Sequence, residues 1–319
     1  MAQRDIDVEC REAGLRDGIQ IVKTFFPTEE KIRWIRDEAA AGMPNIQVCS
    51  FVPPKLLPQF SDAAEVAAAS LKIEELWVSA LVPNLRGAED ALRVGVHEID
   101  FMNSVSESHS MSNGRRSTAE SLAEFKRVVA LRDSLPKDRR FKLASGFATS
   151  FGCSIEGNVP HKAVMAAIEK FVAAGTQEVV IADTVGYGNP RDVKELFTQV
   201  IKAFGDDVLV AAHFHDTRGL GLANVYAALE AGCRRFDASL AGLGGCPYAP
   251  NATGNIVMED LVFLLEGAGL CTGINLDKLV QVRDIISKNL PDEPLHGTFA
   301  KAGYTKGFRP ASTISMAAE

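Results

Sequence analysis

Two histidines separated by one residue are the clearest sign of chemistry in this sequence. His213 and His215 stand at the end of an apolar run over 208–213 that has the character of a strand. Side chains alternate between the two faces of a strand, so both imidazoles lie on one face, at a spacing suited to one metal ion. Taken alone, the pair fits two hydrogen-bonded core histidines equally well. Its interpretation therefore depends on what lies nearby.

Three further side chains follow other predicted strands. Arg16 and Asp17 come after the first strand, and Asn255 comes after the eighth, next to a glycine. Alone, the first two read as an exposed ion pair of little energetic weight, and the third as a turn residue. In a closed ring of eight strands, however, strands one and seven are nearly adjacent. The two histidines therefore favour a shared site.

The combined ligand set is one carboxylate, two imidazoles and one amide oxygen, from Asp17, His213, His215 and Asn255. Without a thiolate ligand, such a set predicts Mg²⁺ or Mn²⁺ as the cofactor, although Zn²⁺ or Co²⁺ can also occupy it. Cys246 lies in a glycine-rich stretch that is poorly suited to a core. A thiol on such a loop, near a metal and Arg16, can transfer a proton. The alternative is a merely tolerated loop cysteine.

Eight strand candidates alternate with amphipathic stretches, and they cover 7–11, 45–50, 76–81, 98–103, 142–148, 178–182, 208–213 and 235–239. This pattern predicts an α/β fold, a single TIM (β/α)8 barrel, with an open doubly wound sheet as the alternative. Residues 1–270 form the predicted catalytic barrel. Residues 271–319 form a C-terminal helical extension and tail, with a terminal helix over 274–288.

Local signals mark several helix ends. Thr28 is predicted to cap a helix, Ser117 to Glu120 reads as a capping box, and Asn189-Pro190 starts another helix. Gly42, Gly175 and Gly232 follow helical runs, where a C-terminal cap favours a residue that tolerates positive φ.

The composition excludes several classes of protein. A net charge of -7 with few clustered basic residues argues against a nucleic acid or an anionic membrane as partner. The N-terminal residues are charged, and no long apolar run follows, which predicts a cytoplasmic protein. The six cysteines are scattered without a Cys-x-x-Cys pair, so most are expected to be buried thiols. The four other histidines, among them His109, are expected at the surface or at caps. For a soluble enzyme, we expect a homodimer or a higher homo-oligomer.

Three segments together resemble the 3-hydroxy-3-methylglutaryl-CoA lyase family. They are Arg16-Asp-Gly-Ile-Gln20, Ser50-Phe-Val-Pro-Pro-Lys55 and, most specifically, Ser239-Leu-Ala-Gly-Leu-Gly-Gly-Cys-Pro-Tyr248. The similarity runs from about Val8 to Leu270. It implies a retro-aldol cleavage of an acyl-CoA thioester to acetyl-CoA and a 3-oxo acid, which is acetoacetate for the parent substrate.

The resemblance also implies roles for individual residues. The metal ligands are Asp17, His213, His215 and Asn255, and the catalytic residues are Arg16, Asp17, His213 and Cys246. Asp17 or His213 would remove the proton of the substrate hydroxyl, Arg16 would stabilise the enolate, and Cys246 would protonate it. Supporting positions are Gln20, Gln47, Asp183 and Glu259. Lys55 and Arg115 are only candidates for contacts with CoA phosphates.

One departure from the family pattern falls beside the expected site. Where the family has Ile-Glu-Ala-Thr-Ser-Phe-Val, this chain has Ile46-Gln-Val-Cys-Ser-Phe-Val52, so a neutral amide, Gln47, replaces an acid. The change alters the charge around the metal and Arg16. Alternatives therefore stay open: a lyase for isohexenylglutaryl-CoA, citramalyl-CoA or another 3-hydroxy-3-alkyl acyl-CoA, a condensing acyltransferase of the isopropylmalate-synthase kind, or a noncatalytic metal- or ligand-binding barrel.

Overall fold

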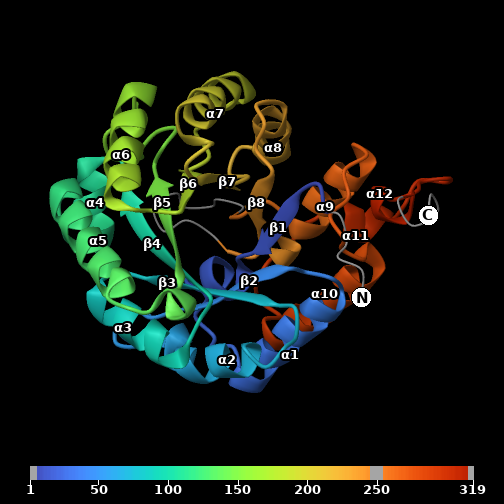
Figure 1. Cartoon of the computed structure of the whole chain (residues 1–319). Helices are drawn as coiled ribbons and strands as arrows, with labels where there is room; N and C mark the ends of the chain where they lie inside the picture. The colour runs from blue at the N-terminus through green and yellow to red at the C-terminus, as the bar shows by residue number, and fades with distance from the viewer. Residues whose placement is uncertain (1–5, 245–253, 315–319) are drawn as a thin grey trace.

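The computed structural model describes residues 6–244 and 254–314. Eight parallel strands form a closed barrel in sequence order, and helices surround it (Figure 1). The strands are β1 Glu9–Glu12, β2 Asn45–Ser50, β3 Trp77–Val82, β4 Glu98–Ser104, β5 Lys142–Ala148, β6 Glu178–Asp183, β7 Leu209–Phe214 and β8 Arg235–Ala238. The predicted barrel is thereby confirmed, and each of the eight predicted strands overlaps an observed one.

At least one helix follows each strand and packs on the outside of the barrel (Figure 1). The helices are α1 Thr28–Ala40, α2 Ala63–Ser70, α3 Leu85–Val94, α4 Glu107–Gly114, α5 Thr118–Asp133, α6 His161–Ala174, α7 Pro190–Phe204, α8 Gly221–Glu230, α9 Met258–Gly267, α10 Leu276–Asn289, α11 Phe299–Ala302 and α12 Ala311–Ile314. The predicted terminal helix corresponds to α10, which packs against α1 and α9. Within the described residues, no helix is long and apolar enough to cross a membrane.

Most of the predicted helix ends are confirmed. Ser117 and Glu120 form a complete capping box at α5, and Asn189 caps α7. The three predicted glycine caps all have positive φ, at Gly42, Gly175 and Gly232. The predicted cap at Thr28 is wrong: α1 starts after Pro27 without a side-chain cap. The Thr28 hydroxyl instead donates to the Asp62 carboxylate at 2.8 Å, because α2 begins beside α1 and offers a charged acceptor.

The interior of the barrel is ionic at its centre. Arg11 of β1 is buried, and its guanidinium lies 2.8 Å from Glu98, 2.9 Å from Asp100 and 2.8 Å from Asp237. Glu178 of β6 lies 3.6 Å away. Barrel interiors are more often filled with branched apolar side chains. Here one guanidinium links the strands β1, β4, β6 and β8 below the mouth of the barrel, and buried charges of this kind require such pairing.

Two buried carboxyl groups lie against each other behind β1. Glu12 accepts the N–H groups of Gly14 and Leu240, while Glu38 of α1 faces Glu12. Burial raises the pKa of Glu12 to about 8, and burial together with the neighbouring Glu12 raises that of Glu38 well above its usual range. The pair therefore holds protons in the folded protein at neutral pH.

This pair predicts a pH dependence of stability. A carboxyl whose pKa is raised on folding stabilises the folded state below its unfolded pKa, near 4.5, and this contribution is lost as pH rises toward 8. Glu38→Gln removes one titrating group, so the free energy of unfolding should fall less steeply between pH 5 and pH 8, by up to about 1.4 kcal/mol per pH unit. Urea unfolding of both proteins across this range measures the slopes. Equal slopes would show that Glu38 takes up no proton on folding in this pH range.

Candidate active site

A π-helical turn, η1 (Gly14–Gly18), presents Arg16 and Asp17 at the end of β1. Its wide turn is closed by the bond from the Ile19 N–H to the Gly14 carbonyl at 2.9 Å. A Cβ at Gly14 would lie 2.5 Å from the Glu12 carboxylate and 2.8 Å from the Ser239 hydroxyl, so the turn requires glycine there. The turn thereby points two charged side chains into the mouth of the barrel.

Asp17, His213 and His215 converge on one point. The Nε2 atoms of the two histidines are 3.2 Å apart, and Asp17 Oδ2 lies 3.7 Å from Nε2 of His213 and 3.5 Å from Nε2 of His215. Ligands bound about 2.1 Å from a Mg²⁺ ion at right angles are about 3 Å apart. The three atoms thus have the chemistry and nearly the spacing of ligands to one divalent cation. The expected proximity of the first and seventh strands is confirmed, because only β8 lies between them in the barrel.

Asp237 of β8 orients His213. Its carboxylate lies 3.2 Å from His213 Nδ1, which leaves Nε2 facing Asp17 and His215. Carboxylates that bind the second nitrogen of a metal-ligating histidine are common in metal sites. Burial lowers the pKa of His213, but Asp17 and Asp237 on either side raise it to about 8. Burial raises the pKa of Asp17, but Arg16 and the two histidines outweigh burial and hold it well below the usual range.

Asn255 reaches the same point from beyond β8. A backbone bridge pairs it with His215, and its side-chain nitrogen donates to Asp17 Oδ2 at 2.9 Å. Its Oδ1 atom is buried and has no hydrogen-bond partner among the described residues. A buried carbonyl oxygen without a partner is costly unless something binds it. Rotation of this amide would turn the oxygen toward the three ligands, as a fourth cation ligand requires.

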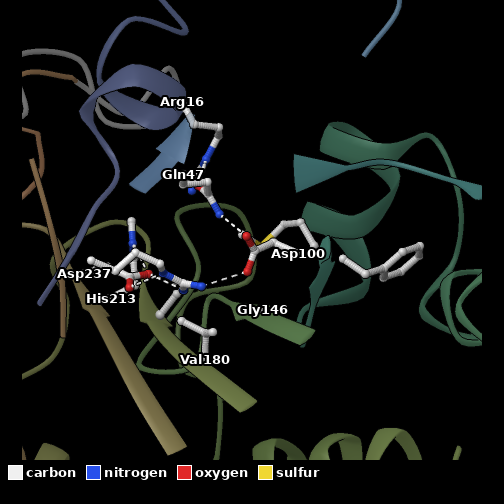
Figure 2. Close-up of a pocket in the computed structure, with 11 residues that line it drawn as sticks. Arg16, Gln47, Asp100, Gly146, Val180, His213 and Asp237 are labelled. Atoms are coloured by element: carbon white, nitrogen blue, oxygen red, sulfur yellow. Dashed lines mark hydrogen bonds and ion pairs between the residues drawn. The ribbon is translucent and has the colours of Figure 1, made fainter. Parts of the chain in front are cut away.

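A pocket opens beside these ligands. Its lining includes Arg16, Gln47, Asp100, His213 and Asp237, drawn in Figure 2. The Arg16 guanidinium donates to the Gln47 carbonyl oxygen and to Asp17. Gln47 in turn donates from Nε2 to Asp100 Oδ2 at 2.6 Å. Burial raises the pKa of Asp100 and Glu98 adds to the rise, while Arg11 opposes it. The pocket thus offers a cation, an amide and a carboxyl group within reach of the proposed metal site.

Other predicted residues lie farther from the three ligands. Asp183 accepts the N–H groups of Tyr187 and Gly188 at 2.8 and 2.9 Å, so it shapes the loop between β6 and α7. Glu259 of α9 accepts the N–H of Ala241 at 2.9 Å and a bond from Arg283, and so supports the turn after β8. Gln20 is half-buried at the end of the turn after β1. The two candidates for CoA phosphates, Lys55 and Arg115, are exposed on separate loops. Cys246 lies outside the described residues.

Three residues of this region were missed by the sequence reasoning. Asp100 and Asp237 sit inside strands that were counted only as apolar elements, although Glu98-Ile-Asp100 places two acids on one face of β4, a spacing that could have revealed Asp100. His109 was expected at the surface or at a cap, and it does not lie at the surface. It is buried at the start of α4, and its Nδ1 lies 2.7 Å from the Ser104 hydroxyl, because Ser104 ends β4 directly beneath it.

Comparison with known proteins identifies the family of this chain. A family model described as HMGL-like matches residues 7–286. The chain belongs to the HMGL-like family. It is 37% identical to hydroxymethylglutaryl-CoA lyase YngG of Bacillus subtilis over 90% of this chain and 96% of that protein. It is 38% identical to mitochondrial hydroxymethylglutaryl-CoA lyase of Mus musculus, over 89% of this chain and 86% of that protein.

A solved structure is also similar to this fold over almost the whole chain. It is an HMG-CoA lyase from Acinetobacter baumannii in complex with coenzyme A and 3-methylmalate, with a TM-score of 0.88 and 36% identity. The alignment covers 97% of this chain and 99% of that one. The predicted family is confirmed, and with it the prediction of a carbon–carbon lyase.

Proposed function

We propose that this protein cleaves 3-hydroxy-3-methylglutaryl-CoA to acetyl-CoA and acetoacetate with the help of a divalent cation. The observation that carries the proposal is the convergence of Asp17, His213 and His215, within 4.8 Å of one another, at the mouth of a barrel of the HMGL-like family. Carboxylate and imidazole ligands suit Mg²⁺ or Mn²⁺, and also admit Zn²⁺ or Co²⁺. Asn255 supplies a fourth ligand through its amide oxygen.

Each residue at the mouth has a role in this reaction. A bound cation supplies a Lewis acid that polarises the oxygens of the substrate. Asp17 accepts the proton of the tertiary hydroxyl, and Asp237 fixes the His213 ring so that Nε2 faces the proposed cation site. When the carbon–carbon bond breaks, negative charge develops on the thioester oxygen of the leaving enolate, and the Arg16 guanidinium stabilises it there. Cys246 donates the proton that turns the enolate into acetyl-CoA.

The substrate is held as an acyl-CoA. The Acinetobacter baumannii relative binds coenzyme A in its solved structure, and this chain aligns with it along almost its whole length. The exposed cations Lys55 and Arg115 are candidates for the phosphates of CoA. A homo-oligomer, a cytosolic location, and the absence of nucleic-acid and membrane partners stay predictions from the sequence.

The proposal is tested with purified wild-type protein and a panel of acyl-CoA thioesters. Release of acetyl-CoA is measured with 3-hydroxy-3-methylglutaryl-CoA, citramalyl-CoA and isohexenylglutaryl-CoA, each with Mg²⁺ or Mn²⁺. We expect the highest kcat/KM with 3-hydroxy-3-methylglutaryl-CoA. A higher kcat/KM with citramalyl-CoA or isohexenylglutaryl-CoA would identify that thioester as the substrate and leave the proposed reaction type unchanged. Absence of acetyl-CoA from the whole panel would refute the proposed cleavage.

A further inference from the structure

Arg16 is held in the pocket by a hydrogen-bonded series that begins on another strand. Its Nε donates to Gln47 Oε1 on β2, and Gln47 Nε2 donates to Asp100 Oδ2 on β4. The second oxygen of Asp100 accepts from Arg11 at 2.9 Å. All four side chains are buried, with Gln47 only 3% exposed and Asp100 5% exposed. Figure 2 shows Gln47 pointing from Arg16 toward Asp100.

The chemistry of these groups fixes the orientation of the Gln47 amide. A guanidinium can only donate, so the atom of Gln47 that faces Arg16 must be the carbonyl oxygen. The amide nitrogen must then face Asp100, whose carboxyl oxygens accept from donors on both sides, Gln47 and Arg11. An amide is therefore the side chain that fits between Arg16 and Asp100, because it accepts on one side and donates on the other.

The backbone of β2 supports this placement. The register with β3 shifts directly after Gln47, where a bulge lies between Gln47 and Cys49. Bulges redirect side chains and are common beside active sites. At its other end, Arg16 contacts Asp17. The guanidinium is thus held at two points, one toward the proposed metal ligands and one toward Asp100.

We infer that Asp100 is a positioning residue for Arg16 and acts through the Gln47 amide. Of the two negative groups that hold Arg16, Asp17 contacts it directly, whereas Asp100 of β4 acts on it through the hydrogen bonds of Gln47. This inference rests on the proposed function, in which Arg16 stabilises the enolate oxygen. Holding a charged donor where charge develops contributes to catalysis because no reorganisation is needed during the reaction.

The test exchanges the two groups. In Gln47→Glu, a carboxylate faces the Asp100 carboxyl, and the pair repels. In Asp100→Asn, Arg11 takes the new amide oxygen, so a nitrogen faces Gln47 and Arg16 loses its fixed acceptor. Each single variant should lower kcat by about 10- to 100-fold with a smaller effect on KM. In the double variant Gln47→Glu/Asp100→Asn, the new amide nitrogen at position 100 donates to the new carboxylate at position 47, which still accepts from Arg16. The net charge equals that of the wild type, and kcat should be at least about tenfold higher than in either single variant.

A matched control separates positioning from a general effect on the ionic centre. Glu98 lies two residues before Asp100 on β4 and accepts from the same Arg11 atom at 2.8 Å, but it is not bonded to Gln47. Glu98→Gln also removes one negative charge beside Arg11, yet it should not rescue Gln47→Glu. The inference would be overturned if Glu98→Gln rescued Gln47→Glu. It would also be overturned if the fold-loss of kcat in the double variant Gln47→Glu/Asp100→Asn equalled the product of the two single fold-losses.

A second readout does not depend on the substrate. The same variants are unfolded in urea without metal or thioester, where Gln47→Glu should lose free energy of unfolding and Asp100→Asn should restore it in the double variant. If wild-type protein fails to cleave the thioester, the proposed function fails while this cycle still reports the pairing. If the wild type is active and neither cycle shows rescue, the positioning role fails and the proposed function stands.

Discussion

His215→Ala should leave the folded protein without its cation and lower turnover by more than about 100-fold. The side chain offers Nε2 to the position shared with Asp17 and His213, and its loss removes one of three convergent ligands. Replacement of groups that merely orient metal ligands already costs about 10- to 100-fold in affinity or activity. Metal content after dialysis, measured by elemental analysis, and kcat with saturating Mn²⁺ are the two readouts.

A second histidine provides the control for this result. His161→Ala changes a half-buried histidine at the start of α6 whose Nδ1 lies 3.9 Å from Glu195 of α7, outside the Asp17, His213 and His215 cluster, and should keep both metal and turnover. Full metal content and full activity in His215→Ala would mean that the cation binds elsewhere. Loss of both in His161→Ala as well would indicate a general loss of structure.

Cys246→Ala should lower kcat by about 10²- to 10⁴-fold, the range for removal of a general acid, while the metal content stays that of the wild type. Its thiol has the proposed task of protonating the enolate, and the cation is assigned to Asp17, His213 and His215 among the described residues. Single-turnover mixing with 3-hydroxy-3-methylglutaryl-CoA measures the slow release of acetyl-CoA. Cys246→Ser should stay slow, because a hydroxyl is a far weaker acid than a thiol.

The matched control is a thiol far from the proposed chemistry. Cys233 is buried before β8, where its Sγ donates to the Arg235 carbonyl at 3.3 Å. Cys233→Ala should leave kcat unchanged and cost only stability. A Cys246→Ala protein with wild-type turnover would remove the thiol from the mechanism, and one that loses its metal would make Cys246 a ligand.

The arrangement of the strands could be predicted from the sequence, because it follows from the spacing of apolar residues and from the order of strands and helices along the chain. Eight apolar runs separated by helical stretches fit a closed barrel, and closure places the turn carrying Asp17 near His213. Side chains alternate between the two faces of a strand, so the face on which a residue lies can also be predicted. This alternation placed His213 and His215 on the same face. The Asp17, His213 and His215 cluster therefore needed no coordinates to be predicted.

The interior contacts could not be predicted in the same way. Whether Gln47 of β2 meets Asp100 of β4 depends on the stagger of strands around the barrel and on the bulge after Gln47. The ionic centre around Arg11 likewise depends on which side chains of the four strands meet at the same height along the barrel axis. Thr28 illustrates the same limit: its hydroxyl binds Asp62, from a helix that starts more than thirty residues later.

Restoration of activity by added metal tests the central claim most directly. Wild-type protein is stripped with a chelator, Mn²⁺ is added in steps, and the release of acetyl-CoA and acetoacetate from 3-hydroxy-3-methylglutaryl-CoA is followed. The Asp17, His213 and His215 site predicts no release without metal and full release at about one ion per chain. Cleavage at the full rate by metal-free protein would contradict it.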